Sequence, residues 1–145
     1  MTLDNITIGA DPELFITNNN STISAVNLIP GTKKKPWKAE DMPEGFALQT
    51  DNVLAEFNIP PVDNMDKFVC SIEYMKDYIR KYVKTINPAY DIKCSASEIL
   101  PEEELQTKQS LMFGCDVDYN AYTESTNPKP QGTATNLRSA GQMEA

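Results

Sequence analysis

Histidine is absent from all 145 residues of the sequence. Its absence excludes the Ser-His-Asp and Cys-His nucleophile arrangements and removes the commonest protein ligand of transition metals. Acid–base or metal chemistry in this chain therefore has to rely on carboxylates, lysines or the backbone.

Cysteine is scarce, and the three cysteines present form no Cys-x-x-Cys pair. Their odd number and wide spacing, at Cys70, Cys94 and Cys115, argue against a disulfide framework and against a zinc site. We expect three buried free thiols, because an unpaired cysteine behaves as a small apolar side chain.

Long apolar runs and basic charge are also lacking. No run approaches the roughly 20 apolar residues that cross a bilayer, and the start, MTLDNITIG, lacks the features of a secretory signal. We therefore expect a cytoplasmic protein without a membrane partner. The net charge of −8 argues against nucleic-acid binding through phosphate neutralisation, although an acidic surface can attract a basic protein.

The strongest strand signal lies in residues 46–61, FALQTDNVLAEFNIPP. Asp51 and Asn52 form a turn dipeptide, and apolar residues alternate with other residues after it. The period of two places Glu56 on the opposite face of its strand from Phe57. Pro60 and Pro61 then end the strand, which is the third strand of the chain.

The strongest helix signal follows directly. Asp63 or Asn64 can cap a helix whose apolar residues recur at spacings of three and four, and Asn87-Pro88 ends it. The apolar stripe consists of Phe68, Ile72, Met75, Ile79 and Tyr82.

Shorter strands are predicted elsewhere, over residues 5–16 with a break at Asp11-Pro12, and over residues 22–28, 91–97 and 111–117. The whole pattern predicts an α+β domain over residues 1–118, with a mainly antiparallel sheet covered on one face by one long helix. Residues 119–145 are polar and rich in proline and glycine, which predicts a loop or a C-terminal tail.

Four carboxylates form the candidate functional site: Asp11 and Glu13 in the first strand segment, with Asp51 and Glu56 in the third. If these strands are neighbours, the acids converge on the face that the helix leaves open. Hard oxygen ligands suit magnesium or manganese, and paired carboxylates can also perform acid–base chemistry. A solvated acidic sheet face is the alternative.

The lysine run Lys33, Lys34 and Lys35 precedes Pro36 and Trp37. These lysines could bind a phosphate or another acidic group. The alternative is a mobile basic loop, because the run lacks the spacing of a P-loop and no helix follows it.

Six short motifs occur in an order that resembles the phage-encoded COOH–NH2 ligases of type 2, or amidoligases. The resemblance covers residues 8–141, nearly the whole chain. The motifs are IGADPELFI, PGTKKKPW, ALQTDNVLAEFNIPP, LMFGCDVDYNAYT, NPKP and LRSAG.

The resemblance implies a glutamine-synthetase-like half-fold and an ATP- and magnesium-dependent reaction. In such ligases a carboxylate is activated as an acyl phosphate and attacked by an amine. Glu13 and Glu56 would be the metal ligands, with Asp11 and Asp51 as supporting acids. Arg138 would be a charge partner for phosphate or for a substrate carboxylate.

The chain also departs from the family pattern. LRSAG is followed by QMEA instead of a His-x-His strand and a second half, so we expect an incomplete catalyst. Two other interpretations remain: a non-catalytic acidic protein that binds a host or phage partner, for example to inhibit host defence, and an incomplete gene product that folds. An exposed sheet edge would also permit a homo-oligomer.

Overall fold

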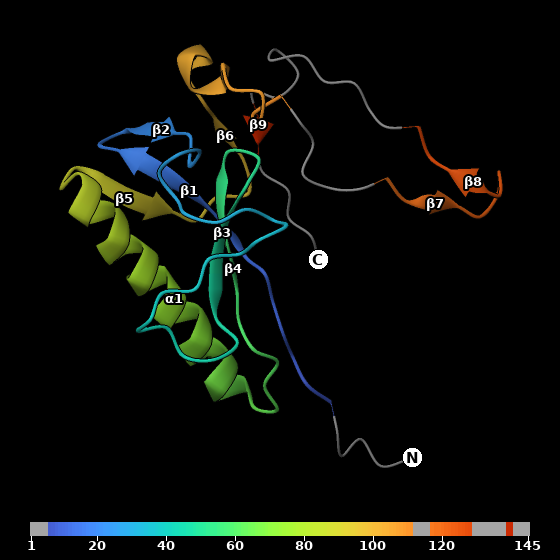
Figure 1. Ribbon diagram of the computed structural model, residues 1–145, viewed down its shortest axis with the longest axis horizontal. Coiled ribbons are helices and arrows are strands. Elements are labelled where there is room, and N and C mark those ends of the chain that lie inside the picture. The colour runs from blue at the N-terminus through green and yellow to red at the C-terminus, as the bar shows by residue number, and fades with distance from the viewer. Residues whose placement is uncertain (1–5, 112–116, 129–138, 141–145) are drawn as a thin grey trace.

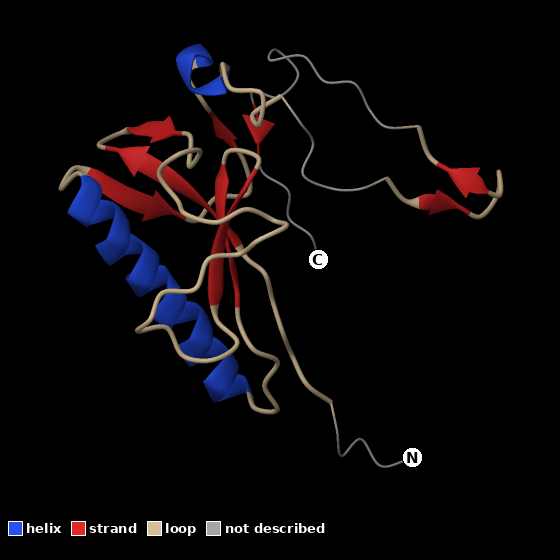
Figure 2. Ribbon diagram, in the orientation of Figure 1, coloured by secondary structure: helices blue, strands red, loops and turns tan. Residues whose placement is uncertain are grey.

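A single five-stranded antiparallel sheet, with one long helix against one of its faces, forms the body of the protein (Figures 1 and 2). The computed structural model describes residues 6–111, 117–128 and 139–140. The predicted α+β class, with a mainly antiparallel sheet covered by one helix, is confirmed. Among the described residues, no helix is long and apolar enough to span a membrane.

The sheet has the strand order β2-β1-β4-β3, and β5 also pairs with β1. Its strands are β1 (Glu13–Asn18), β2 (Ser21–Ile23), β3 (Ala47–Asp51), β4 (Leu54–Asn58) and β5 (Tyr90–Lys93). The free side of β3 is engaged by a loop, since Trp37 bridges to Leu48 and Thr32 bridges to Thr50.

Asparagine residues at positive φ close both hairpins. Asn19 has φ 52° between β1 and β2, and Asn52 has φ 50° between β3 and β4. Asparagine tolerates this left-handed conformation better than most residues, so the turns form where the sequence predicts them. The register that results pairs Glu13 with Glu56, and Glu56 in turn with Gln49.

The break predicted at Asp11-Pro12 is the point where β1 begins. Proline cannot donate a ladder hydrogen bond, and the strand starts at Glu13, directly after Pro12. The chain before the strand still runs beside β4, because the Phe57 amide donates to the Pro12 carbonyl (3.1 Å) and the Ile59 amide donates to the Ala10 carbonyl (3.3 Å).

The helix α1 (Met65–Ile86) begins at the cap that the sequence predicts. The Asn64 side chain accepts hydrogen bonds from the Asp66 amide (2.8 Å) and the Lys67 amide (3.3 Å), which satisfies two backbone donors of the first turn. The helix packs its apolar stripe on the sheet. The core between them includes Leu14, Ile16, Leu48, Ala55, Phe57, Met75, Ile79 and Val83.

The opposite face of the sheet carries a second, smaller apolar cluster. It consists of Phe15, Val53, Leu54, Leu100 and Leu105. Leu105 belongs to the short 3-10 helix η1 (Glu102–Leu105), and the preceding strand β6 (Glu98–Ile99) pairs with β9 (Ser139–Ala140). Residues near position 100 therefore cover part of the face that α1 leaves open.

Several predictions need correction. The strand expected over residues 91–97 ends at Lys93. The segment after residue 118 contains a small hairpin, β7 (Tyr119–Asn120) with β8 (Ser125–Thr126). Of the strand expected over residues 111–117, residues 112–116 lie outside the described residues.

The expected burial of the cysteines is wrong for the two that the structure describes. Cys70 and Cys94 are both exposed. Cys70 lies off the apolar stripe of α1, and Cys94 follows directly after the last residue of β5. Cys115 lies outside the described residues.

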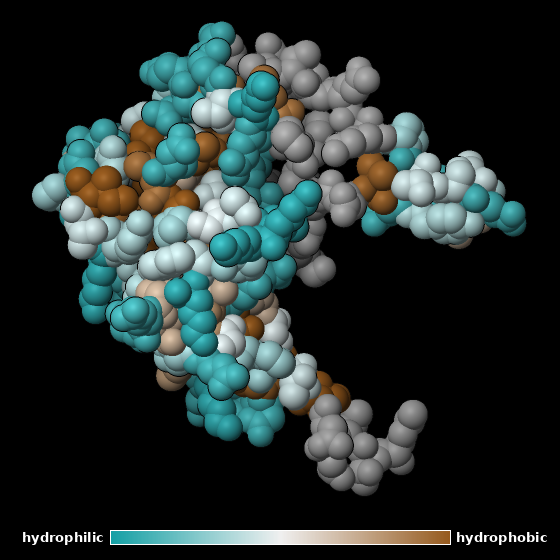
Figure 3. All heavy atoms as spheres, in the orientation of Figure 1, coloured by the Kyte–Doolittle hydropathy of each residue, from teal (hydrophilic) through white to brown (hydrophobic). Residues whose placement is uncertain are grey.

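Hydrophilic side chains dominate the face of the molecule shown in Figure 3, in keeping with the charged composition.

Candidate functional site

Strand alternation in β4 turns Glu56 and Asn58 toward the face opposite α1, while Ala55 and Phe57 point into the helix-covered core. Glu56 occupies a central position on its face. It stands opposite Glu13 of β1 on one side and opposite Gln49 of β3 on the other. The register of three strands thus gathers polar side chains around one buried glutamate.

Three carboxylates meet at this point. Glu13, Asp51 and Glu56 each present a carboxylate oxygen, and all three atoms lie within 4.8 Å of one another. Glu56 and Asp51 are buried, with 5% and 7% of their surface exposed, and Glu13 is half-buried. We call Glu13, Asp51 and Glu56 the carboxylate cluster.

The electrostatics of the carboxylate cluster penalise the charged form of Glu56. Burial is the main cause that raises the pKa of Glu56, and the charges of Asp51 and Asp11 raise it further. A hydrogen bond from Gln49 and the charge of Lys33 act in the opposite direction. Asp11 therefore influences the carboxylate cluster through its charge, although it is not one of the three acids within 4.8 Å.

Lys33 is the lysine of the basic run that reaches the carboxylate cluster. Its Nζ lies 2.9 Å from Asp51 Oδ2, and the ion pair joins an almost buried carboxylate to a half-exposed lysine. Lys34 and Lys35 are exposed. The role of the three lysines in phosphate binding stays a prediction, and Arg138 lies outside the described residues.

Sequence reasoning did not single out Gln49 and Asn58 as members of the site. Gln49 Oε1, Glu56 Oε2 and Asn58 Oδ1 are buried and have no hydrogen-bond partner among the described residues. Buried polar atoms are nearly always paired in native proteins. The signal available in the sequence was strand alternation, which places Asn58 on the same face of its strand as Glu56.

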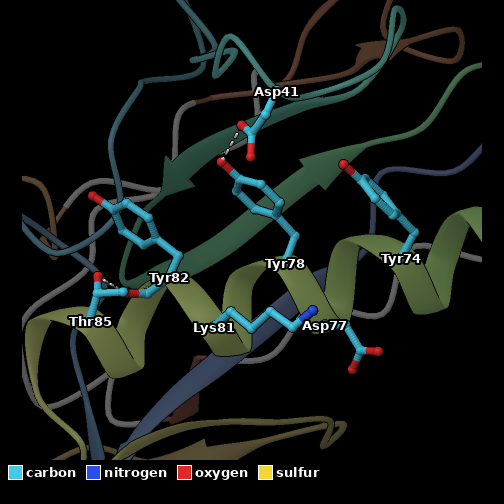
Figure 4. Close-up of a pocket in the computed structure, with 7 residues that line it drawn as sticks. All are labelled: Asp41, Tyr74, Asp77, Tyr78, Lys81, Tyr82 and Thr85. Carbon is cyan, nitrogen blue, oxygen red and sulfur yellow. Dashed lines mark hydrogen bonds between the residues drawn. The ribbon is translucent and has the colours of Figure 1, made fainter.

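A second concave feature, the tyrosine groove, lies between α1 and the loop that precedes β3 (Figure 4). It encloses about 490 Å³. The lining residues are Asp41, Tyr74, Asp77, Tyr78, Lys81, Tyr82 and Thr85. The Tyr78 hydroxyl donates a hydrogen bond to Asp41 Oδ1 at 3.2 Å. Burial, with help from this bond, raises the pKa of Tyr78 to about 12.

The tyrosine groove and the carboxylate cluster share no residue. The groove carries aromatic rings and two acids on the helix side of the sheet, whereas the carboxylate cluster lies on the other face.

Comparison of the chain with protein-family models, with curated proteins and with solved structures found no match. Arguments about function therefore rest on the side chains themselves.

Proposed function

We propose that the protein binds a divalent cation, Mg²⁺ or Mn²⁺, through Glu13, Asp51 and Glu56, and that it is related to ATP-dependent carboxylate–amine ligases. The observation that carries the proposal is the carboxylate cluster, in which three oxygens lie within 4.8 Å of one another. Glu56 Oε2 is buried there without a hydrogen-bond partner among the described residues.

A bound cation resolves the electrostatic conflict in the carboxylate cluster. Lys33 neutralises Asp51, but burial and the charges of neighbouring acids disfavour the ionised form of Glu56. A divalent cation with hard oxygen preference satisfies the free oxygen of Glu56 and offsets the repulsion. The donor set, made of carboxylates alone, fits Mg²⁺ or Mn²⁺ better than zinc.

The ligase relationship rests on the ordered motifs, of which IGADPELFI contributes Glu13 and ALQTDNVLAEFNIPP contributes Asp51 and Glu56. When bound, Mg²⁺ would supply neutralisation of charge on ATP phosphate oxygens. The carboxylate cluster would hold the cation at the sheet surface. Lys33, whose side chain is half-exposed beside Asp51, would contact the transferring phosphate.

A non-catalytic role in protein binding is the second candidate, and the tyrosine groove favours it. Tyrosine side chains offer large rigid contact surfaces together with a hydroxyl, and Tyr74 is 38% exposed. With a net charge of −8, the protein would attract a basic partner.

Calorimetric titration of MgCl2, followed by ATP in the presence of Mg²⁺, tests the first candidate. We compare the wild type with Glu56→Gln, which keeps the shape of the side chain and removes its charge. Glu44→Gln, at an exposed position, is the matched control. We expect Mg²⁺ to bind the wild type and the control and to stabilise both by about 2.7 kcal/mol at 100 times the dissociation constant.

Glu56→Gln should show neither Mg²⁺ binding nor Mg²⁺-dependent ATP binding. A wild-type protein that produces no heat with MgCl2 would refute the metal site. If Mg²⁺ binds and ATP does not, the result supports the cation site and removes the ligase relationship. The protein-binding role is then the better candidate.

A further inference from the structure

Two buried carboxamide oxygens beside the carboxylate cluster have no hydrogen-bond partner among the described residues. They are Gln49 Oε1 and Asn58 Oδ1, and 97% of the Gln49 surface is buried, since 3% remains exposed. Folding removes such oxygens from water, and the loss is unfavourable unless a donor replaces the water. Their presence on one face of one hairpin calls for a donor that the described part of the chain does not provide.

The orientation of the Gln49 amide is fixed by its neighbour. Gln49 makes a side-chain hydrogen bond to Glu56. An ionised carboxylate only accepts, so Gln49 must present its Nε2 group to Glu56. Its Oε1 atom is then not the atom that meets Glu56, and it keeps no hydrogen-bond partner among the described residues.

The two oxygens lie beside the carboxylate cluster. Gln49 stands directly opposite Glu56 in the β3–β4 ladder. Asn58 follows Glu56 by two residues in β4, so both side chains project from the same face of the sheet. The carboxylates and the unsatisfied carboxamides thus project from the same face of the sheet.

We propose that Gln49 and Asn58 accept hydrogen bonds from water molecules bound to the cation that Glu13, Asp51 and Glu56 hold. The inference rests on the proposed metal site. An octahedral Mg²⁺ with three carboxylate ligands has about three positions left for water, and it retains such water strongly. Each bound water carries two O–H donors, which are the groups that the carboxamide oxygens lack. Gln49 and Asn58 are positioning residues, since they act on the cation through its water.

The inference predicts different effects of one substitution on folding and on binding. Gln49→Met keeps the length of the side chain and removes its buried polar atoms. In EDTA, the midpoint of urea unfolding should stay close to that of the wild type, because removal of the unsatisfied acceptor offsets loss of the hydrogen bond to Glu56. The affinity for Mg²⁺, measured by calorimetry, should fall by about 10- to 100-fold, the usual effect of losing an outer-shell partner.

A matched control is available on the same strand. Leu48 is fully buried on the helix side of β3, so Leu48→Met changes packing without touching the polar face. It should leave Mg²⁺ affinity unchanged. Asn58→Leu provides a second, independent test of the polar face, with the same expected loss of Mg²⁺ affinity, should Gln49→Met fail to fold.

The outcomes separate the two proposals. A wild type that does not bind Mg²⁺ refutes the metal site itself. Wild-type binding that persists unchanged in Gln49→Met or Asn58→Leu refutes the role of the carboxamides and leaves the metal site intact. A lower urea midpoint with unchanged Mg²⁺ affinity would assign Gln49 to folding alone, which also overturns the inference.

Discussion

The two faces of β4 differ sharply in what they bury. Ala55 and Phe57 are completely buried against α1 and the rest of the apolar core. Glu56 and Asn58, their immediate neighbours, bury oxygen atoms that lack partners among the described residues. Burial of hydrocarbon on the helix-covered face stabilises the fold, whereas burial of unpaired polar groups on the other face destabilises it.

This difference separates folding from function within a single strand of five residues. Packing explains the helix-covered face, since each of its side chains has apolar neighbours. On the other face, packing explains Leu54, which belongs to the second apolar cluster. It does not explain Glu56 and Asn58, because apolar residues at these two positions would stabilise the fold better. Residues that lower stability at a buried position are typical of sites that bind or react.

Truncation of the apolar face should give the largest effect on stability. Phe57→Ala removes a fully buried aromatic ring and should lower the free energy of unfolding by about 3–5 kcal/mol. Urea denaturation in EDTA measures the loss. Ile99→Ala, at a position that is 76% exposed, should change stability little. A loss below about 1 kcal/mol for Phe57→Ala would mean that the two faces do not differ as proposed.

Glu56 on the polar face should make the free energy of unfolding depend on pH. Because burial raises the pKa of Glu56 in the folded state, the folded protein keeps this proton over a pH range in which the unfolded chain has lost it. The free energy of unfolding therefore decreases as pH rises through that range. The unfavourable contribution begins above the pKa of the unfolded chain and is complete above the pKa of the folded protein.

Comparison with Glu56→Gln isolates this effect from other acids. Asp91 is one acid whose pKa is lowered, in its case by the Ile92 amide and by Lys84, despite opposing desolvation, and it contributes the opposite trend. In EDTA, the stability advantage of Glu56→Gln over the wild type should grow as pH rises above 4.5, the ordinary pKa of a glutamate. An advantage that stays constant over this range would contradict the buried, ionised Glu56.

The apolar face was largely predictable from the sequence, and the polar face only in part. Period-two alternation around Phe57 and the stripe through Met75 and Ile79 define elements by local pattern. The meeting of Glu13 with Glu56 depends on which strands pair and in which register. Strand pairing and register are set by tertiary packing. The sequence therefore identified the candidate residues but not the distances between them.

Gln49 shows why part of the site could not be predicted. A glutamine in a strand is common in sequences. Only the burial of Gln49 opposite Glu56 makes its side-chain oxygen a candidate site atom. The cysteines show the reverse error, since residue type suggested burial for Cys70 and Cys94, while position decides exposure. Burial belongs to the fold as a whole, which residue type predicts only on average.

The smallest effect is expected in the tyrosine groove beside α1, where a polar contact remains close to water. The Tyr78 hydroxyl donates to Asp41 at the surface, so Tyr78→Phe should lower the free energy of unfolding by about 1 kcal/mol or less. In ultraviolet absorbance titration, the phenol with a pKa of about 12 should disappear. Asp41→Asn should lower that pKa, because it removes the negative charge beside the hydroxyl while it preserves an acceptor. Mg²⁺ affinity should be unchanged in both variants. A reduced affinity would show that the tyrosine groove and the carboxylate cluster are energetically coupled, so that the two faces do not act independently.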